Sequence, residues 1–299
     1  MPEYLKYALK RLFAAVMVAL LGMSLMYMMP LIKGDPTVRI DLAGYVEHMR
    51  KMLGMDFGFS KFYRTEVSPL VWRYLPYTMA LCLFSEITAW IVGSLIGLFA
   101  SAGKSSFASK LVRGAAMVIY PIPYFILAIT VQIVFAYILG WFPVIGEILT
   151  GRGFVVFITS LLRSSALPAL ALILSGLGRW VINTGSVASV QYAEDHVLFA
   201  RLRGLKRRTV LTKYVMSGCL PLQAAALGVQ LGTAFGGSII TEMMYAYPGL
   251  GFLMQRAVIN NDYNLLTGAS VVSIVAIAFF TFVSDLILPL LDPRITYKK

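Results

Sequence analysis

The sequence predicts an all-α membrane protein with six transmembrane helices. Of its 299 residues, 59% are hydrophobic and 13% are charged, and the mean hydropathy is +0.77. An ordinary soluble domain has about 25% charged residues. The apolar residues also form six runs near or beyond the roughly 20 residues that cross a bilayer, a length that a water-soluble core does not need. These two observations exclude a soluble globular protein.

The six predicted spans follow one another in a single domain without a detectable internal repeat. They cover residues 12–32, 76–100, 115–139, 161–187, 220–243 and 265–291. The fourth is the least regular, because Gly176, Gly178, Arg179 and Asn183 interrupt it. Such interruptions are covered by neighbouring helices or mark a cavity. We divide the chain into residues 1–32 (N-terminus and first span), 33–75 (extracytoplasmic segment), 76–291 (five-helix core, including the loop 189–216) and 292–299 (tail).

The distribution of basic residues predicts that both termini are cytoplasmic. One side of the membrane carries 15 Lys and Arg in 61 positions, and the other side carries 10 in 85. The denser side contains both termini, and cytoplasmic loops carry the excess of Lys and Arg. We attribute the net charge of +12 to this topology, because no polar domain is present that would gather a basic patch for nucleic acid.

The first extracytoplasmic segment contains a predicted amphipathic helix on the outer surface. Apolar residues repeat at helical spacing from Leu42 to Leu53. The segment at Asp56–Ser60 then predicts a turn, after which the chain enters the second span.

The longest cytoplasmic loop, residues 189–216, predicts two short helices around a glycine. Acidic residues begin the first helix and basic residues end it, which suits the helix dipole. Gly204 stands where a left-handed residue is needed, and Thr209 is a plausible N-cap for the second helix. The first helix carries apolar residues on more than one side. It is either a surface helix with its basic residues on lipid headgroups or a docking element for a soluble partner.

This loop resembles the coupling loop of ABC importer permeases, in the variant of the dipeptide, oligopeptide and nickel family. The matching residues are Asp195, Ala200, Arg201 and Gly204, followed by basic residues and then by Leu220-Pro221 seventeen positions after the glycine. Leu198 departs from the pattern, because it stands where the general motif begins with Glu.

Further landmarks of the same family follow in order along nearly the whole chain. They are Gly34–Pro36, Asp56–Ser60, Leu75–Thr78, Pro121–Phe125, Leu139–Pro143, Ala166–Pro168, Gln230–Thr233, Gly236-Gly237, Thr241-Glu242, Tyr247–Gly251, Asp262-Tyr263 and Leu291–Arg294.

The resemblance implies the type I ABC importer permease fold with a cytoplasmic coupling helix. It also implies a second homologous permease subunit, two cytoplasmic ABC ATPase subunits that hold ATP and Mg, and an extracytoplasmic substrate-binding protein. The substrate would be a peptide or a related small solute, with nickel or a metal chelate as a further candidate. The residues expected to take part in coupling are Tyr192, Asp195, His196, Phe199, Ala200, Arg201, Arg203 and Gly204.

Four ionisable residues fall inside or at the edges of the spans: Glu86, Arg179, Glu242 and Asp285. A charge at the bilayer centre costs roughly 2.5–3.5 kcal/mol, so each should face the protein interior, water or an interface. The alternatives are a pair or hydrogen bond between helices, or a place along the translocation pathway. We select Arg179 and Glu242 as pathway candidates.

Gly228, Gly232 and Gly236 repeat every fourth residue along the fifth span. Small residues at this spacing let another helix approach closely. The other helix belongs either to the chain's own bundle or to the partner permease.

The sequence offers no enzyme or metal site. It contains no H-E-x-x-H, G-x-S-x-G or G-x-x-x-x-G-K-[ST] motif, so we expect no ATP binding or hydrolysis by this chain. His48 and His196 lie on opposite sides in the predicted topology, and Cys82 and Cys219 have no metal-ligand spacing. The remaining alternative to a transporter is a membrane scaffold or channel subunit without ATPase partners.

Overall fold

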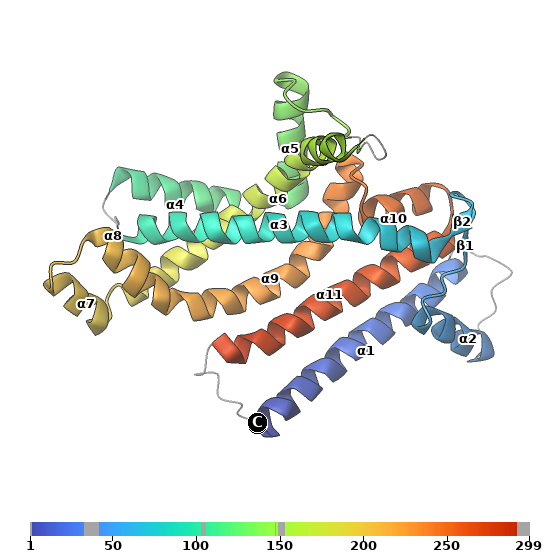
Figure 1. The fold of residues 1–299 in the computed structure, drawn as a ribbon, viewed down its shortest axis with the longest axis horizontal. Coiled ribbons are helices and arrows are strands. Elements are labelled where there is room, and N and C mark those ends of the chain that lie inside the picture. Colours follow the sequence, from blue (N-terminus) through green and yellow to red (C-terminus); the bar gives the residue numbers. More distant parts are fainter. Residues whose placement is uncertain (1, 33–41, 103–105, 147, 149–152, 292–299) are drawn as a thin grey trace.

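A computed structural model describes residues 2–32, 42–102, 106–146, 148 and 153–291. The landmark Gly34–Pro36 and the tail 292–299 lie outside this part of the chain. Nearly all of the described structure is helical, and the long helices lie side by side (Figure 1).

Five helices in the described residues are long and apolar enough to cross a membrane, and a sharply bent helix pair makes a sixth span if its two parts cross together. The five are α1 (Pro2–Ile32), α3 (Val67–Ala102), α6 (Phe154–Gln191), α9 (Met216–Tyr245, continuous with α8 at Arg207–Thr209 and the π-helical turn η2 at Val210–Val215) and α11 (Tyr263–Leu291). The predicted all-α fold class is therefore confirmed, and five or six spans are consistent with the predicted six.

The third span differs from the straight helix expected over residues 115–139. It consists of α4 (Phe107–Ile119) followed by α5 (Tyr124–Gln132) and the π-helical turn η1 (Ile133–Ile138), with a bend of 104° between the two parts. Pro121 and Pro123 fall in the break. Proline has no backbone N–H and clashes with the preceding turn, so two prolines this close end α4. In Figure 1, α5 and the start of α6 project from the body of the molecule.

The fourth span is one unbroken helix despite its irregular sequence. Gly176 and Gly178 lie inside α6 and let the neighbouring helices α3 and α4 come close. A Cβ atom at Gly176 would lie 2.8 Å from the Ala89 side chain, and one at Gly178 would lie 3.0 Å from the Ala116 carbonyl oxygen. These glycines are packing positions of a continuous helix.

Helix α6 packs most extensively on α3, while α11 packs on α9 and α1. The close approach of α3 to α6 depends on two glycines of α3. A Cβ atom at Gly93 would lie 2.6 Å from the Trp180 side chain, and one at Gly97 would lie 2.5 Å from the Val181 carbonyl oxygen.

The shorter elements lie at the two ends of the bundle. The predicted amphipathic helix is confirmed as α2 (Leu42–Leu53), and its place on the outer surface stays a prediction. An antiparallel hairpin of β1 (Phe59–Ser60) and β2 (Thr65–Glu66) follows it. These elements and α10 (Leu250–Ile259) lie at one end, and α7 (Asp195–Leu202) lies at the other (Figure 1).

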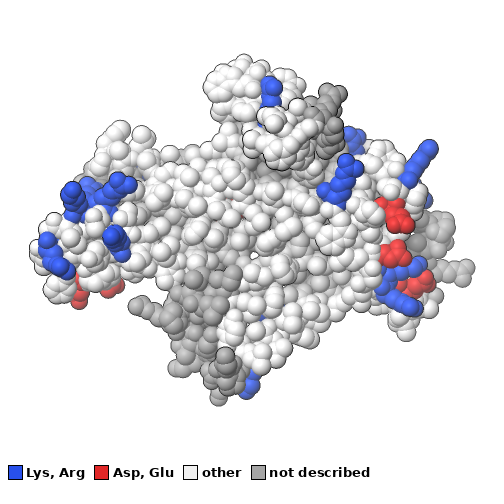
Figure 2. Space-filling model, viewed as in Figure 1, with Lys and Arg blue, Asp and Glu red and all other residues white. Residues whose placement is uncertain are grey.

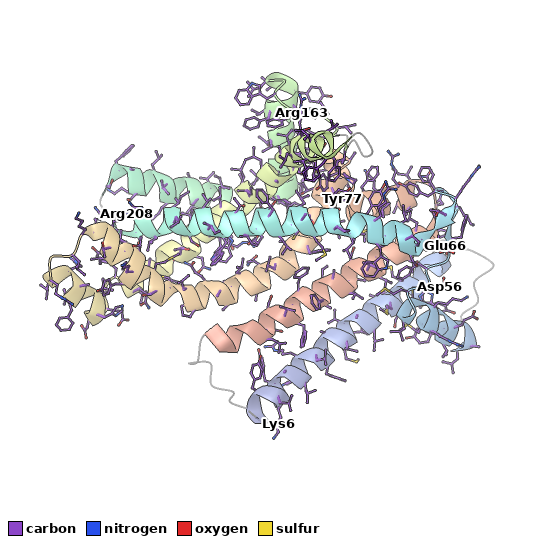
Figure 3. The ribbon with its side chains drawn as sticks, viewed as in Figure 1. Lys6, Asp56, Glu66, Tyr77, Arg163 and Arg208 are labelled. Carbon is purple, nitrogen blue, oxygen red and sulfur yellow. The ribbon has the colours of Figure 1, made fainter. Side chains whose placement is uncertain are left out.

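Charged side chains gather at the same two ends, with a largely uncharged belt between them (Figure 2). Arg208 marks the end that carries α7, and Asp56 and Glu66 mark the opposite end (Figure 3). Such a belt is what a bilayer requires, because a charge within the hydrocarbon is costly. The structure is that of a multi-pass membrane protein.

Candidate functional site

Helix α7 has the charge arrangement that the sequence predicts. Glu194 is its N-cap residue, with extended backbone, and Asp195 lies in its first turn while Arg201 lies in its last. Acidic residues near the start and basic residues near the end both favour the helix dipole.

The loop after α7 turns at Gly204, whose φ is +71°. Its backbone N–H donates to the Arg201 carbonyl at 3.0 Å, and the Leu205 N–H donates to the Ala200 carbonyl at 3.4 Å. This pair of bonds is the Schellman arrangement, in which a left-handed residue closes the helix. The expected C′ role of Gly204 is thus confirmed.

The expected N-cap role of Thr209 is wrong. The chain re-enters helix at Arg207, with Lys206 as the N-cap residue, and Thr209 already has helical backbone angles. The turn at Gly204 needs only two further residues to redirect the chain, so the next helix begins earlier than the sequence suggested.

Two residues anchor α7 to the membrane-spanning helices. Val197 is fully buried and Ala200 is 3% exposed. They belong to an apolar cluster that joins α7 to α3, α6 and the start of α9 through Leu98, Ala188, Val210, Leu211, Val215 and Cys219. The side of α7 with Val197 and Ala200 is therefore already occupied.

The other sides of α7 expose large apolar side chains. The exposed fractions are 46% for Leu198, 64% for Phe199 and 73% for Leu202. Most of the residues expected to take part in coupling are also exposed, namely Asp195, His196, Phe199, Arg201, Arg203 and Gly204. Tyr192 is half-buried, with the Arg201 guanidinium 5.0 Å from the centre of its ring. We name the surface formed by Leu198, Phe199 and Leu202 the docking face.

A cavity of about 250 Å³ lies between α3, α5, α6 and α9. Its wall contains two of the four ionisable residues of the spans, Glu86 and Arg179. The remaining lining residues are small, polar or apolar: Cys82, Ser85, Tyr124, Leu172, Ser175, Gly176, Thr233, Ala234 and Gly237. A mostly apolar wall with a few polar groups is typical of small-molecule sites.

Each charged group of the cavity is held by a hydrogen bond to a neighbour on another helix. The Arg179 guanidinium donates a hydrogen bond to the side-chain oxygen of Gln230 on α9. The Trp180 indole Nε1–H donates to Glu86 Oε1 at 2.8 Å, which links α6 to α3. Glu86 is one of the four ionisable residues of the spans but is not one of the two predicted pathway residues.

Glu242 lies elsewhere, in a fully buried junction beside the start of α10. Its Oε2 accepts a hydrogen bond from the Gly251 N–H at 2.7 Å, and the Leu250 N–H donates to Thr78 Oγ1 at 2.8 Å. These bonds join α3, α9 and α10. Glu242 is not among the residues that line the cavity, and its role in translocation stays a prediction.

Two of the three glycines on α9 face a helix of the same chain. A Cβ atom at Gly228 would lie 2.6 Å from the Ser284 side chain, and one at Gly232 would lie 2.7 Å from Thr281 Oγ1. Both neighbours belong to α11, which is the alternative of packing within the chain's own bundle, and contact of these glycines with a partner permease stays a prediction. Small residues accept whichever helix is nearest, and here the following span occupies the face. Only Gly236 of the three has open space around its Cβ position.

The described residues contain no group of three or more His, Cys, Asp and Glu that could hold a metal ion. His48 lies on α2 and His196 on α7, at opposite ends of the molecule in Figure 1.

Comparison with known proteins identifies the kind of protein to which this bundle belongs. The family described as "Binding-protein-dependent transport system inner membrane component" matches residues 93–297. The chain belongs to this family. The match covers α6, α7, α9 and α11, and therefore both the docking face and most of the cavity wall.

Three relatives of this permease are permease proteins of transport systems. The peptide transport system permease protein SapB of Salmonella typhimurium is 28% identical over 262 residues, which cover 81% of each chain. The putrescine export system permease protein SapB of Escherichia coli K12 is 27% identical over the same shares. The oligopeptide transport system permease protein AppB of Bacillus subtilis is 27% identical over 85% of this chain and 80% of its own. None of these three names mentions nickel.

Proposed function

We propose that this permease is a subunit of an ATP-driven importer and forms half of a translocation pathway for peptides or related small solutes. A second, homologous permease would form the other half, two cytoplasmic ATPase subunits would supply energy, and an extracytoplasmic binding protein would deliver the substrate. Two of the three relatives are named for peptides or oligopeptides, which favours peptides over nickel chelates.

The docking face is the observation that carries this proposal. Phe199 and Leu202 are largely exposed at the charged end of the molecule, although burial of such side chains is worth about 1.5–3 kcal/mol each. The residues on the opposite side of α7 already fill the contact with the membrane domain. A soluble partner that covers the docking face would bury the exposed side chains.

The position of α7 gives a route from ATPase movement to the cavity. The helix lies between the end of α6 and the start of α8 and α9 in the chain, and α6 and α9 carry Arg179, Gln230 and Thr233. ATP binding would close the ATPases and carry α7 with them. Rigid rotation of α6 and α9 would then expose the cavity to alternate sides of the membrane.

Affinity purification from mild detergent tests the proposal. We expect the tagged permease to retain a second permease and ATPase subunits, and its complex to hydrolyse ATP. The double variant Phe199→Ser/Leu202→Ser should lose the ATPase subunits and keep the second permease. Leu42→Ser, which alters a residue 79% exposed on α2, is the matched control and should retain both.

A permease that purifies alone and inert, under conditions that preserve other membrane complexes, would contradict the proposal. It would favour a scaffold or channel subunit without ATPase partners.

A further inference from the structure

The carboxyl group of Glu86 is fixed in the cavity wall with one oxygen bonded and the other without a hydrogen-bond partner among the described residues. The residue is 7% exposed, and its donor Trp180 is 1% exposed. The Trp180 ring also lies edge-on to Trp90, with 6.5 Å between ring centres. Trp180 therefore has little freedom to move away from Glu86 Oε1.

The other oxygen, Oε2, lies near the part of the wall formed by Gly176. It is 3.7 Å from the Cβ position of Gly176, and both residues line the cavity. No Lys or Arg nitrogen in the described part of the chain lies within 4.0 Å of the Glu86 carboxyl oxygens. Arg179 shares the cavity and its positive charge acts on Glu86 from a distance, but its guanidinium donates its hydrogen bond to Gln230 and forms no ion pair with Glu86 within 4.0 Å.

A buried carboxylate without an ion-pair partner is costly, and either a proton or a bound cation removes that cost. An ammonium group supplies up to three N–H donors, and its hydrogen bonds to a carboxylate are roughly twice as strong as neutral ones. The cavity, at about 250 Å³, is smaller than the 300–1,000 Å³ typical of sites for whole drug-sized ligands. It is suited to one end of a solute.

We infer that Glu86 binds the ammonium group of the transported solute, the free N-terminus in the case of a peptide. The inference rests on the proposed function, because it assigns a specificity residue to the same pathway. The apolar and small residues around Glu86, such as Leu172, Ala234 and Gly237, then surround the first part of the solute beyond its nitrogen.

The test is uptake by the complete transporter, with its binding protein, reconstituted in vesicles. The two probes are tri-alanine and N-acetyl-tri-alanine, the second at a concentration that gives measurable uptake by the wild type. Glu86→Gln keeps an oxygen that can accept the Trp180 bond and removes the charge. We expect it to lower tri-alanine uptake at least tenfold and to change N-acetyl-tri-alanine uptake less than twofold.

The measured quantity is the ratio of tri-alanine uptake to N-acetyl-tri-alanine uptake, compared between variant and wild type. A change in this ratio reports on the permease, because both assemblies contain the same binding protein. Asp285→Asn is the control and should leave the ratio unchanged. Asp285 forms an ion pair with Arg11 at 3.3 Å, and neither residue lines the cavity. Glu86→Asp keeps the charge and should retain part of the preference. Equal thermal unfolding midpoints of the variants exclude a folding defect.

The outcomes separate the inference from the proposed function. Equal losses for both probes in Glu86→Gln, or no loss for either, would overturn the ammonium assignment while ATP-dependent uptake by the wild type still supports the transporter. No ATP-dependent uptake of either probe by the wild-type assembly would overturn the proposed peptide importer, and the assignment with it.

Discussion

Gly204 sets the direction of the chain after α7 through its backbone angle alone. Its φ is +71°, and a Cβ atom placed on it would meet no other atom within 4 Å. A β-branched side chain is therefore excluded by backbone strain and not by lack of space. The left-handed conformation costs about 1–2 kcal/mol for residues with a Cβ, and Asn tolerates it better than Val.

Gly204→Val should uncouple ATP hydrolysis from uptake. The strain would lower the ratio of native to altered loop conformations by a factor of roughly 5–30, which corresponds to one or two kcal/mol. We expect ATPase activity to persist while uptake falls by a comparable factor. Gly204→Asn alters the same position with less strain and should keep most of the uptake. Normal uptake in Gly204→Val would contradict the claim that the left-handed backbone at this position is needed for coupling.

Gly251 illustrates the opposite case, a glycine required by lack of space. A Cβ atom there would lie 2.2 Å from the Ile239 carbonyl oxygen and 2.7 Å from the Ile239 Cα, both backbone atoms that cannot turn aside. Gly251→Ala should therefore separate α10 from α9 and disturb the bond to Glu242. Overpacking of this kind costs about 1–3 kcal/mol.

We expect the thermal unfolding midpoint of Gly251→Ala in detergent to fall by several degrees. Gly114→Ala is the matched control, because Gly114 lies within α4 with nothing within 4 Å of its Cβ position. It should leave the midpoint unchanged or raise it, since alanine favours a helix interior by about 1 kcal/mol over glycine. An equal response of the two variants would contradict the packing argument.

The sequence shows that an ionisable residue lies in a span but not what surrounds it. Glu86 is seven residues before Gly93 and eleven before Gly97, a spacing that puts all three on one face of a helix. That face packs on α6, so the spacing was a usable signal for an interior position of Glu86. Glu242 stands fourteen residues after Gly228, again on a packed face, which predicts the buried junction better than an open pathway.

At the scale of elements, the spans could be predicted and the bend within the third could not. Mean hydropathy is high in both α4 and α5, so a sliding window joins them into one span. Pro121 and Pro123 mark the break, but Pro76, Pro168 and Pro221 lie inside continuous helices. Proline alone therefore does not decide whether a helix ends, because tertiary contacts can compensate for the missing N–H.

The contact between α2 and α1 holds a half-buried histidine. Ser24 and Tyr45 share a hydrogen bond of 2.8 Å, and the Tyr27 ring lies 5.2 Å from the His48 ring. His48 bonds to the Met23 backbone, while its Nε2 is buried without a hydrogen-bond partner. Burial lowers the pKa of His48 from its ordinary 6.5, the Met23 bond opposes this, and the positive charge of Lys51 lowers the pKa further.

A lowered histidine pKa means that the folded contact favours the neutral ring. Its contribution to stability is complete above the ordinary pKa and is lost as the pH falls through the folded value. We expect α2 to loosen from α1 as the pH falls below the ordinary histidine pKa of 6.5. Protonation would place a buried N–H at Nε2 without an acceptor, near Lys51 and Arg50 on the same helix.

Hydrogen exchange of residues 42–53 at pH 7.5 and pH 5.5, corrected for intrinsic rates, measures this loosening. Protection should fall at the lower pH in the wild type. In His48→Gln, which cannot titrate, protection should be the same at both values. The Glu47–Lys51 ion pair at 2.8 Å is exposed and present in both proteins, so it contributes equally to both measurements. A pH effect that survives in His48→Gln would assign the loosening to another group.

Across the whole molecule, the sequence predicts the number of spans but not which spans are neighbours. The first and last helices, α1 and α11, pack together, with an Arg11–Asp285 ion pair at 3.3 Å and a bond of 3.1 Å from the Tyr4 hydroxyl to the Leu286 carbonyl. Hydropathy carries no information on such pairing, because every apolar helix face fits lipid as well as another helix. The predicted even number of spans agrees with this contact, which brings the start of α1 to the end of α11.

The predicted orientation can be tested on the whole protein by labelling single added cysteines. The native Cys82 and Cys219 are 2% and 0% exposed, so they should react slowly and give a low background. Lys61 in the β1–β2 hairpin and Lys206 after α7 are both exposed, and their elements lie at opposite ends of the molecule.

A maleimide that cannot cross membranes should label Lys61→Cys in intact cells and should label Lys206→Cys only after the membrane is opened. The unaltered protein under both conditions gives the background from the native thiols. The Lys and Arg excess predicts this result, because the predicted side of the loop with Lys206 carries 15 Lys and Arg in 61 positions and the predicted side of Lys61 carries 10 in 85. The reverse pattern would place the docking face outside the cell, where no ATP is available to a partner, and the proposed ATPase contact could not then exist.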